Sequence, residues 1–588
     1  MGQTKLINIS EVKRALRVNG LTGAFMATIA MKVAGFDILN AIYSHIYKYQ
    51  GADFADQLIK YLEVTIDSND EMFDNIPVSG PVVFTSNHPF GGLDAMVALS
   101  VLHKVRPDIK ILTNFLIAKI PNTKENFISV DTTYGFGRYV RSNFSGLRQA
   151  EEHLNNGGAL LMFPAGEVAS EKNGEIQDSE WKSSLMKMIR RTNSSVVPIY
   201  FHGGNSKYYQ FVDRISSKLS SLCLPGELNK KKGKVVKMRI GLPVVKTDIS
   251  SRDDSSLAKF LRSRTYLLES EIQSLKKSVY TVPIATPVEP KLLVSELKAN
   301  EKCKLFDVDH QSCYLLDFKD APNIMREIAI RREEAFRAVG EGTDKELDTD
   351  EFDLYYKHLV LWDNNTNDLV GAYRLALGAE VLAKKGIHGF YSDTLFHYRE
   401  GFADVLNESV ELGRSFVSIS HQKDTLALIL LLKGLFYTAI KYPEYKHLLG
   451  PVSISSWYPK LYRSLMIDYL RGHYAIPEYS GLISPKRPFV AEYGRVDRDV
   501  LMEGKETNLE VFDRSLYRMS GKYKLPPLVK KYIKLGARII DYNVDPDFNY
   551  CVDGLIMLTL ENIPTDDLDA LSREFDDKGP IYKRFYNM

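Results

Sequence analysis

The stretch "TSNHPFGGLDAMVAL", Thr85 to Leu99, places a histidine, a Pro-Phe-Gly-Gly turn and an aspartate between two apolar runs. The residues that lead into it, 81–87, read "PVVFTSN", and their β-branched and aromatic side chains predict a buried strand. The run from Asp94 on, "DAMVALSVL", predicts a helix with an acidic residue in its first turn, where the helix dipole favours it. The sequence therefore predicts a strand, a tight turn and a helix, with ionisable side chains at the turn.

These ionisable side chains, His88 and Asp94, are candidates for acid–base chemistry. Gly91 and Gly92 allow the backbone to fold tightly enough to bring the carboxylate back to the imidazole. A carboxylate on one ring nitrogen fixes the tautomer, so the other nitrogen can take a proton from a hydroxyl that attacks an acyl group. We interpret His88 as a general base and Asp94 as its partner. The alternative is a capping aspartate beside an unrelated loop histidine.

The composition fits a globular protein with more than one core, because the chain has 588 residues, 44% of them hydrophobic and 26% charged. Its net charge of +2 argues against a nucleic-acid binder. The four cysteines form neither a CxxC pair nor a metal-ligand spacing, so we expect reduced thiols, a cytoplasmic protein and no metal site. They are Cys223, Cys303, Cys313 and Cys551.

The N-terminal segment, residues 1–50, is expected to lie on a membrane. Its start is polar and lacks the apolar core of a signal peptide. Its longest uncharged run, Val18–Met31, is shorter than the roughly 20 residues of a spanning helix. We therefore expect amphipathic helices that hold the protein peripherally on lipids of the inner face of the cytoplasmic membrane; a core helix of a soluble domain is the alternative. The basic run Asn229–Arg239 suits anionic headgroups or a solvated hairpin.

The chain divides at residues 281–292, where three prolines exclude a helix: Pro283, Pro287 and Pro290. This Pro-rich linker separates an N-terminal domain, 51–280, from a C-terminal domain, 293–588. In the N-terminal domain, "GGALLMFPAGEVAS" (157–170) and "SSVVPIYFHGGNS" (194–206) each predict a buried strand that ends in a glycine-bearing turn. Such turns meet at one edge of an open α/β sheet, where the binding site lies.

Three short strings in the N-terminal half carry a family resemblance. "NHPFGGLD", "FPAGEVAS" and "VVPIY", in this order and spacing, resemble motifs of the glycerolipid (lysophospholipid) acyltransferases over about residues 75–245. That family carries NHxxxxD, an arginine motif, FPEG and a VPI-type strand. The resemblance implies that His88 is the general base, that Asp94 is its partner, and that the acceptor pocket is lined by Phe163, Pro164, Gly166 and Glu167.

This half departs from the family at three places. One extra residue separates the histidine from the aspartate, Asp131 stands where the family has an arginine, and Ala165 replaces the glutamate of FPEG. An aspartate repels a phosphate, whereas an arginine binds it through paired charged hydrogen bonds. We therefore expect an acceptor other than glycerol phosphate. Arg138 or Arg141 in the arginine's role would keep a lysophosphatidate acceptor possible.

The second half resembles another acyltransferase group over about residues 295–565. "IRREEAFRAVGEGTDKELDTDEFDLYYKHLVLWD" (330–363), "DLVGAYRLALG" and "SVELGRSFVSIS" are similar to the acyl-homoserine-lactone-synthase-like branch of the GNAT superfamily. Within that branch, the N-acyltransferases of ornithine lipids and related aminolipids are especially similar. The matching positions are Arg332, Phe336, Asp350, Asp353, Arg374, Glu411 and Arg414.

Each charged position has a possible role and an alternative. Asp350 and Asp353 suit an α-ammonium group at a pocket mouth, or they cap a helix. Arg374 suits the carboxylate of an amino acid. Glu411 is our candidate base for the amine, directly or through water. Glu411 and Arg414 form either a surface salt bridge or, as their apolar strand favours, part of a buried polar network.

The expected acyl donor is a protein. Common GNAT enzymes hold the coenzyme A pyrophosphate with a glycine-rich turn before a helix, but "SHQKDTLALILLLKGL" (420–435) has no glycine until Gly434. We expect an acyl carrier protein rather than coenzyme A as donor, and no bound cofactor. A carrier protein is acidic, so basic residues near this helix would bind it.

Together, the resemblances imply two α/β domains, one glycerolipid-acyltransferase-like and one GNAT-like, in a bifunctional acyltransferase of aminolipid synthesis. The C-terminal domain would N-acylate an amino acid, ornithine or glycine, with a 3-hydroxyacyl group. The N-terminal domain would then acylate the 3-hydroxyl, and such an acceptor has no phosphate. The alternatives are a lysophospholipid acyltransferase fused to an N-acyltransferase and a non-catalytic, hemolysin-like membrane-binding protein.

Overall fold

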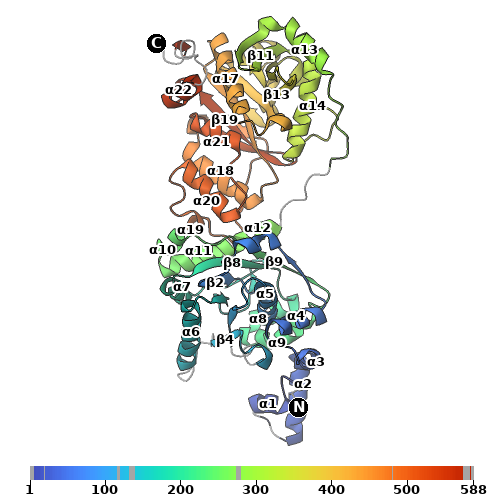
Figure 1. Cartoon of the computed structure of the whole chain (residues 1–588), viewed down its shortest axis with the longest axis vertical. Coiled ribbons are helices and arrows are strands. Elements are labelled where there is room, and N and C mark those ends of the chain that lie inside the picture. The colour runs from blue at the N-terminus through green and yellow to red at the C-terminus, as the bar shows by residue number, and fades with distance from the viewer. Residues whose placement is uncertain are drawn as a thin grey trace. The chain divides into compact units, whose positions relative to one another are not determined.

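The structure is a computed structural model that describes residues 5–16, 18, 20–114, 120–130, 140–272, 280–479, 481–573 and 583–584. The chain forms two compact units (Figure 1). Unit 1 comprises Met1–Gln273 and Tyr493–Lys522, and unit 2 comprises Ser274–Glu492 and Tyr523–Met588. Each unit combines helices with a central sheet, which confirms the expected α/β class with two domains.

Two boundaries differ from the sequence-based division. Residues 493–522, expected in the C-terminal domain, belong to unit 1. Residues 281–292 are attached to unit 2: the backbone N–H of Thr281 donates to Asp344 (2.8 Å), and that of Val288 donates to Glu327 (2.8 Å). Pro283 and Pro287 lie in an extended chain, whose N–H groups at Thr281 and Val288 are satisfied by these carboxylates. The expectation that no helix forms there is wrong for 290–292, because Pro290 begins a helix, α13 (Pro290–Ala299), at the first position, where a helix accepts proline.

Unit 1 is built on a seven-stranded sheet with the order β1-β9-β8-β2-β5-β3-β4. Neighbouring strands are parallel except β8 and β9. The strands are β1 (Thr65–Ser68), β2 (Val82–Ser86), β3 (Lys110–Asn114), β4 (Phe127–Val130), β5 (Ala159–Met162), β8 (Ser195–His202) and β9 (Val235–Ile240), with a separate hairpin of β6 (Ser170–Lys172) and β7 (Glu175–Gln177).

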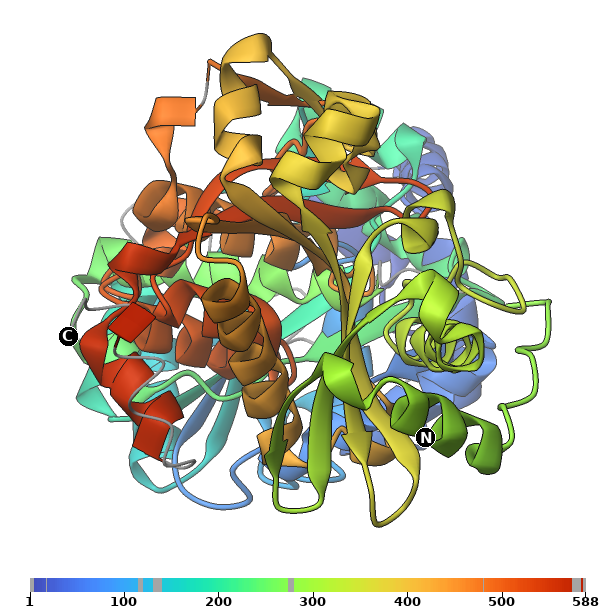
Figure 2. The ribbon, with the colours of Figure 1, turned by 90° about the horizontal axis from the view of Figure 1, so that it is seen from above.

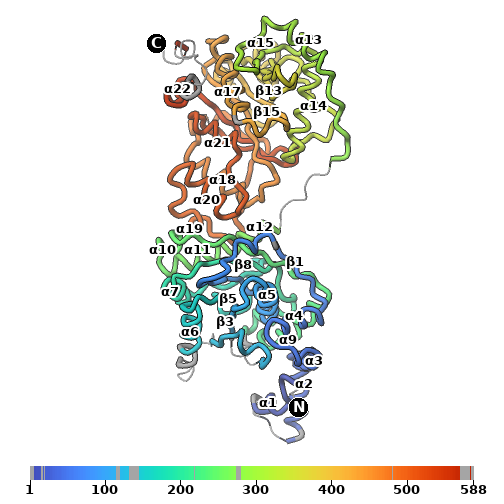
Figure 3. Tube along the Cα trace, in the orientation of Figure 1, coloured from blue at the N-terminus to red at the C-terminus, as the bar shows by residue number. Residues whose placement is uncertain are grey.

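Unit 1 contains helices that pack around this sheet and, at its N-terminus, α1 and α2, which project away from it (Figure 1). Its helices are α1 (Ile9–Leu16), α2 (Gly20–Val33), α3 (Phe36–Ile46), α4 (Gly51–Tyr61), α5 (Gly92–Leu102), α6 (Val140–Asn155), α7 (Met186–Arg191), α8 (Lys207–Ile215), α9 (Ser217–Asn229), α10 (Lys246–Ser250), α11 (Asp254–Leu267), α12 (Glu269–Ile272), α19 (Arg498–Met502) and α20 (Leu509–Ser520). The tube in Figure 3 shows orange α19 beside green α11, two helices that are far apart in the sequence.

The position of β2 decides where the first site lies. Every residue of β2 is buried, as its β-branched sequence predicts, and the strand pairs in parallel with both β5 and β8. The carboxyl ends of parallel neighbours meet at one edge of a sheet. The turns that follow these three strands therefore lie together, as the sequence predicted.

Unit 2 contains an eight-stranded sheet with the order β10-β11-β12-β13-β15-β16-β19-β18. Its twist is seen in Figure 2, with green β10 and β11 at one edge and red β18 and β19 at the other. The strands are β10 (Lys304–Val308), β11 (Gln311–Asp317), β12 (Lys357–Asp363), β13 (Asp368–Leu377), β15 (Ser409–Val417), β16 (His447–Ile454), β18 (Arg538–Asp545) and β19 (Cys551–Thr559), with a small pair of β14 (Phe396–Tyr398) and β17 (Ile483–Pro485). The helices are α13 (Pro290–Ala299), α14 (Pro322–Ala338), α15 (Gly378–Lys385), α16 (Ala403–Asn407), α17 (Thr425–Lys441), α18 (Lys460–Tyr474), α21 (Pro527–Lys534) and α22 (Thr565–Arg573).

The centre of this sheet changes strand direction. β15 is antiparallel to β13 but parallel to β16, and the parallel pairing covers Ser409–Glu411 opposite His447–Leu449. β15 continues to Val417. Glu411 therefore lies at the end of the pairing with β16, and Arg414 lies beyond it.

The N-terminal helices α2 and α3 are apolar but short and bent. Among the residues that the structure describes, no single helix is both long and apolar enough to do so. Thr22–Val33 and Phe36–Ile46 satisfy length and composition only as a pair, and they are bent by 73° relative to each other.

Candidate acyltransfer sites

His88 and Asp94 form an ion pair at the turn between β2 and α5. Nδ1 of His88 lies 2.9 Å from Oδ2 of Asp94, as the spacing of the motif suggested. Gly91 makes the contact possible, because it adopts φ +80° directly before the helix. With Nδ1 directed at the carboxylate, Nε2 is the nitrogen that can accept a proton.

Asp94 is held rigidly by the backbone that it caps. Its Oδ2 accepts hydrogen bonds from the N–H groups of Phe90 (2.9 Å) and Gly91 (3.1 Å). Burial raises the pKa of Asp94 above its ordinary value, although the hydrogen bonds from His88 and from these N–H groups oppose the rise. Asp94 therefore caps α5 and also orients the imidazole, so the two readings of the motif are compatible.

A second aspartate, Asp178, supports the same turn and was not anticipated from the sequence. Its Oδ1 accepts from the backbone N–H of His88 (3.1 Å), and its Oδ2 accepts from Nε1 of Trp181 (2.9 Å). Burial raises the pKa of Asp178 to about 6. The only sequence signal was the short polar run "QDSEW" at 177–181, at the end of the β6–β7 hairpin, which carries no recognisable motif.

One of the expected pocket residues, Phe163, lies against the histidine, and the next, Pro164, is hydrogen-bonded to a lysine. The ring of Phe163 stacks on that of His88, with 4.0 Å between the centroids, and the carbonyl of Pro164 accepts from the N–H of Lys182 (3.0 Å). Phe163 thus fixes the plane of the imidazole.

The rest of this motif lies farther along the turn. Gly166 adopts φ +74°, a left-handed conformation that favours glycine, and Nζ of Lys182 would lie 2.5 Å from a Cβ there. Glu167 is exposed and accepts from Ser179. Ala165 is buried. Asp131 and Arg138 lie outside the described residues, as does the side chain of Arg141.

The segment 493–522 contributes to the back of this site. Arg495 donates to the hydroxyl of Tyr200 (2.8 Å) and pairs with Glu269. Its guanidinium lies 4.8 Å from the ring centroid of Tyr266. The hydroxyl of Tyr266 accepts from the N–H of Asp178 (2.8 Å). A chain of contacts therefore leads from Arg495 to the aspartate that holds His88.

In unit 2, the expected arginines and aspartates form one buried network. Nε of Arg332 lies 2.8 Å from Asp348, and its Nη2 lies 2.9 Å from Asp353. Nη1 of Arg374 lies 2.5 Å from Asp350 and 3.0 Å from Asp353. Asp348 is the member that the sequence analysis missed. These charges are paired with one another, since unpaired charges at such depth would be too costly.

Arg414 joins this network from a distorted part of β15. Its Nη2 lies 3.2 Å from Asp350, and its Nε lies 3.7 Å from Asp348. It adopts φ +50° at a bulge between β13 and β15. A bulge redirects side chains, and such strain is retained where the surrounding contacts require it. Among the described residues, no ion pair links Arg414 to Glu411.

The arginines favour the ionised forms of Asp350 and Asp353. Burial raises the pKa of Asp350, but the charges of Arg374 and Arg414 outweigh burial and lower it below its ordinary value. The same balance, with Arg332 and Arg374 as the cations, lowers the pKa of Asp353. Asp350 also caps the turn at 351–354 by accepting from the N–H of Phe352 (3.0 Å), so the capping alternative holds as well.

Glu411 is buried and saturated with hydrogen bonds. It accepts from the hydroxyl of Tyr356 (2.5 Å) and from the N–H groups of Tyr391 (3.1 Å) and Ser392 (2.9 Å), as well as from the Ser392 hydroxyl. Burial raises the pKa of Glu411. Four donors on two oxygens leave little capacity to accept a substrate proton. This geometry suits a residue that holds the loop at 391–392 in place.

Phe336, another expected residue of unit 2, packs against the hydrophobic cluster beneath α14.

Unit 2 also contains a group of buried carboxyls. Asp545 and Asp553 on β18 and β19 interact electrostatically with Arg414, and burial raises the pKa of each. Burial raises the pKa of the neighbouring Glu341 to about 7. Glu341 lies far from Asp545 and Asp553 in the sequence, so no local pattern predicts their meeting.

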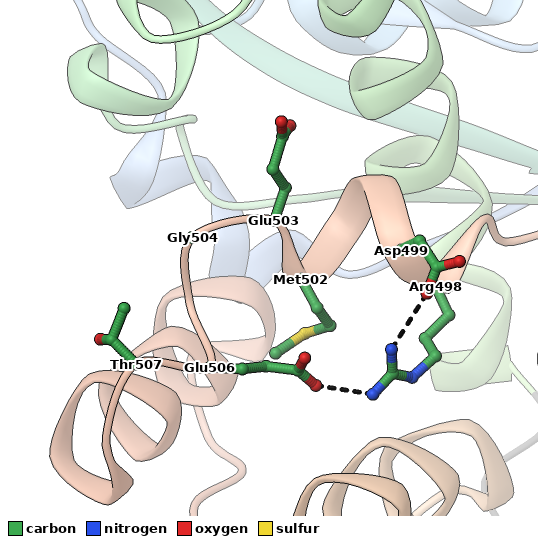
Figure 4. Close-up of a pocket in the computed structure, with 7 residues that line it drawn as sticks. All are labelled: Arg498, Asp499, Met502, Glu503, Gly504, Glu506 and Thr507. Carbon is green, nitrogen blue, oxygen red and sulfur yellow. Dashed lines mark hydrogen bonds and ion pairs between the residues drawn. The ribbon is translucent and has the colours of Figure 1, made fainter. Parts of the chain in front are cut away.

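A surface pocket lies elsewhere, in the segment 493–522 (Figure 4). Arg498 on its wall pairs with Glu506 (2.6 Å) and Asp499 (3.0 Å). Its lining includes none of the candidate catalytic residues. Across the described residues, no group of three or more histidine, cysteine and acidic side chains is arranged to hold a metal ion.

Comparisons with known proteins agree with the two folds. A family model for acyltransferases matches residues 18–275, and one for the acetyltransferase (GNAT) domain matches residues 331–432. A glycine N(alpha)-acyltransferase of Phocaeicola vulgatus is 30% identical over 265 residues, which cover 43% of this chain and 80% of that protein. A protein with the same name from Bacteroides thetaiotaomicron is 28% identical over 298 residues, 48% of this chain and 87% of that protein. A lyso-glycine lipid O-acyltransferase of P. vulgatus is 25% identical over 256 residues, 42% of this chain and 88% of that protein.

The protein is thus an acyltransferase that joins a lipid-acyltransferase domain to a GNAT domain in one chain. It belongs to the family of the P. vulgatus glycine N(alpha)-acyltransferase. An enzyme of this class takes its acyl group from an activated donor and passes it to a nucleophile. Both candidate sites supply groups suited to that task.

Proposed function

We propose that this chain makes a diacylated glycine lipid in two consecutive steps. Unit 2 transfers a 3-hydroxyacyl group to the amine of glycine, and unit 1 then acylates the 3-hydroxyl of the product. The observation that carries the proposal is that two different proteins of one organism, named for an N-acylation and an O-acylation of glycine lipids, each match less than half of this chain. Their combination in one chain fits consecutive reactions.

The chemistry of the second step follows from the His88–Asp94 pair. Nε2 of His88 removes the proton of the acceptor's 3-hydroxyl as that oxygen bonds to the thioester carbonyl carbon of the donor. The carbon–sulfur bond breaks, and the leaving thiolate receives the proton from the imidazolium. Asp94 stabilises that imidazolium at 2.9 Å. An acceptor with a carboxylate and no phosphate is consistent with Ala165 in place of the family's glutamate.

The first step draws on the arginine–aspartate network of unit 2. Among the described residues, Nε and Nη2 of Arg374 are buried without a hydrogen-bond acceptor, and a substrate carboxylate would provide one. Asp350 is the most exposed carboxylate of the network and suits the ammonium group. The amine must lose a proton before it attacks the thioester, and the leaving thiolate gains one.

The donor for the first step is proposed to be an acyl carrier protein. Asp424 caps α17, accepting from the N–H of Leu426 (2.8 Å). Its carboxylate occupies the helix N-terminus where a phosphate would otherwise bind, and it repels a pyrophosphate. A carrier protein offers its thioester without that contact. Lys423, exposed beside this terminus, suits an acidic partner.

The experiment uses a bacterial host without aminolipids, and lipid mass spectrometry after growth with isotopically labelled glycine. The intact chain should yield labelled mono- and diacylated glycine lipids. His88→Ala should yield the monoacylated lipid alone, and Arg414→Ala should yield neither. Label from ornithine in place of glycine, or diacylated lipid formed by His88→Ala, would contradict the proposal.

A further inference from the structure

Helices α8 and α9 carry an apolar stripe that faces solvent. Phe211 is 61% exposed and Ile215 66%, and Tyr208, one helical turn before Phe211, is exposed as well. The spacing of 208, 211 and 215 places them on one helix face, whereas Tyr209 and Gln210 are buried on the opposite side. Leu219 and Leu222 extend the exposed apolar surface onto α9. Contiguous exposed apolar surface of this kind marks an interaction site.

The N-terminal helix α2 also exposes apolar side chains. Phe25 on α2 is 69% exposed and Val33, at its end, is 71% exposed. The following helix, α3, contacts α9 so closely that a Cβ on Gly35 would lie 2.6 Å from the backbone nitrogen of Gly226. The absence of a side chain at Gly35 permits this approach of two backbones. The segment expected to contact the membrane and the α8–α9 hairpin are therefore neighbours in unit 1 (Figure 1).

Cations flank the apolar stripe. Lys207 and Arg214 are exposed on α8, and Lys230 and Lys232 are exposed just after α9. Nζ of Lys230 lies 5.3 Å from the ring centroid of Tyr208, which places this charge at the border of the stripe. Apolar side chains bordered by lysine and arginine are typical of helices that lie in a membrane interface. The basic run at 229–239 therefore begins beside the exposed apolar stripe of α8.

The hairpin also touches the catalytic turn. A Cβ on Gly91 would lie 3.1 Å from Cδ2 of Leu224, so α9 packs against the turn that carries His88 and Asp94. Lys231, which follows α9, places its Nζ 4.2 Å from the ring centroid of Phe90 in the same turn. A lipid substrate that leaves a bilayer at this hairpin would therefore arrive beside the base.

We propose that the α8–α9 hairpin is a second membrane-contacting element, which lies in the interface of an anionic bilayer together with α2. The proposal goes beyond the chemistry assigned above, because it concerns how the enzyme binds lipid surface rather than which acceptor reacts. Phe211 and Ile215 are its apolar anchors, and the cations around them contact anionic headgroups.

The test measures binding of the intact chain to vesicles of phosphatidylcholine with and without phosphatidylglycerol, by co-sedimentation and without substrate. Phe211→Asp and Ile215→Asp should each lower the partition coefficient about tenfold or more, since each removes a large apolar side chain from the bilayer and adds a charge. Val78→Asp is the matched control, because Val78 is 76% exposed in the same unit but outside the stripe. It should bind as the unchanged protein does.

Several outcomes would overturn the proposal. If Phe211→Asp and Ile215→Asp bind vesicles as well as the unchanged protein does, the hairpin has no role in membrane binding. If Val78→Asp loses as much binding as they do, the effect is not specific to the hairpin. A change of oligomeric state in these variants, measured by light scattering, would assign the stripe to contact between copies of the chain. Thermal unfolding of each variant checks that it folds. Because Phe211 and Ile215 are both exposed, their substitution should leave the unfolding temperature unchanged. Because no substrate is present, the result does not depend on the proposed reactions.

Discussion

The guanidinium of Arg495 donates a 2.8 Å hydrogen bond to the hydroxyl of Tyr200, across 295 positions of sequence. Arg495 comes from the half of the chain that was expected to form only the GNAT domain, and Tyr200 lies on β8 beside the first site. The same arginine stacks on Tyr266, whose hydroxyl accepts from the N–H of Asp178. The lipid-acyltransferase unit therefore includes a piece of chain that follows most of the GNAT domain.

Arg495→Ala is expected to impair the second acylation and spare the first. Loss of the guanidinium leaves Glu269 with His202 as its remaining ion-pair partner (3.7 Å) and frees Tyr266 to move, and Asp178 then loses its fixed position under His88. We expect kcat for O-acylation to fall about 10–100-fold, as for loss of a group that positions a catalytic residue. The measurement is single-substrate kinetics with the monoacylated lipid.

Arg495→Lys is the control for this prediction. It keeps the charge and should restore part of the rate without restoring the bond to Tyr200. A purely structural role would instead lower the unfolding temperature and leave the kcat of the folded fraction unchanged. N-acylation measured on the same preparation should stay at the level of the unchanged protein.

The fragment 293–588 is expected to be poorly soluble. Leu501 and Met502 on α19 are buried in unit 1, where α19 packs beside α11. Cutting the chain before residue 293 removes α11 and exposes these side chains. Leu501→Asp should therefore improve the solubility of the fragment and destabilise the intact chain by about 2–5 kcal/mol. Equal effects of this substitution on both proteins, in sedimentation and denaturant unfolding, would contradict the domain arrangement.

His88→Ala is expected to block O-acylation almost completely. Removal of a general base costs about 10²–10⁴ in rate, and nothing in unit 2 depends on this side chain. The monoacylated lipid should accumulate, and mass spectrometry of the lipids measures this. Phe163→Leu is a useful companion, because it removes the ring that stacks on His88 at 4.0 Å and retains an apolar side chain. It should give an intermediate rate.

Glu341 should make the stability of the protein depend on pH. Burial raises its pKa in the folded state to about 7, above the ordinary 4.5. A raised folded-state pKa means that its stabilisation is complete below pH ~4.5 and is lost as the pH rises through about 7. The free energy of unfolding should therefore fall over this range. Glu341→Gln should flatten that part of the curve in denaturant titrations, whereas the exposed Glu351→Gln should leave it unchanged.

Much of the first site could be predicted from the sequence, because its residues are neighbours along the chain. Strand, turn and helix follow each other within 15 residues, and local propensity with two glycines determines where the histidine meets the aspartate. Asp178 lies 90 positions from His88. Its role depends on burial and on the position of a backbone N–H, and neither leaves a local pattern.

In the second site, the resemblance identified the residues but not their partners. The resemblance supplied five charged residues that the structure brings together, yet it assigned Glu411 and Arg414 to one another, whereas they have different partners. A bulge in β15 turns Arg414 toward Asp350 and Asp348. Register shifts of this kind depend on strand pairing at a distance, so spacing within one strand does not reveal them.

Glu411 offers a direct test between a general base and a residue that holds a loop. Its oxygens accept from Tyr356, Tyr391 and Ser392, so the geometry predicts that Glu411→Gln turns an amide N–H₂ toward donors and shifts the loop at 391–392. KM for the amino acid should then rise while the pH profile of kcat keeps its shape. Tyr356→Phe, which removes one of these donors, should change KM in the same direction. If Glu411 is instead the base, Glu411→Gln lowers kcat about 10²–10⁴-fold and removes the acidic limb of the profile, and Tyr356→Phe leaves KM unchanged.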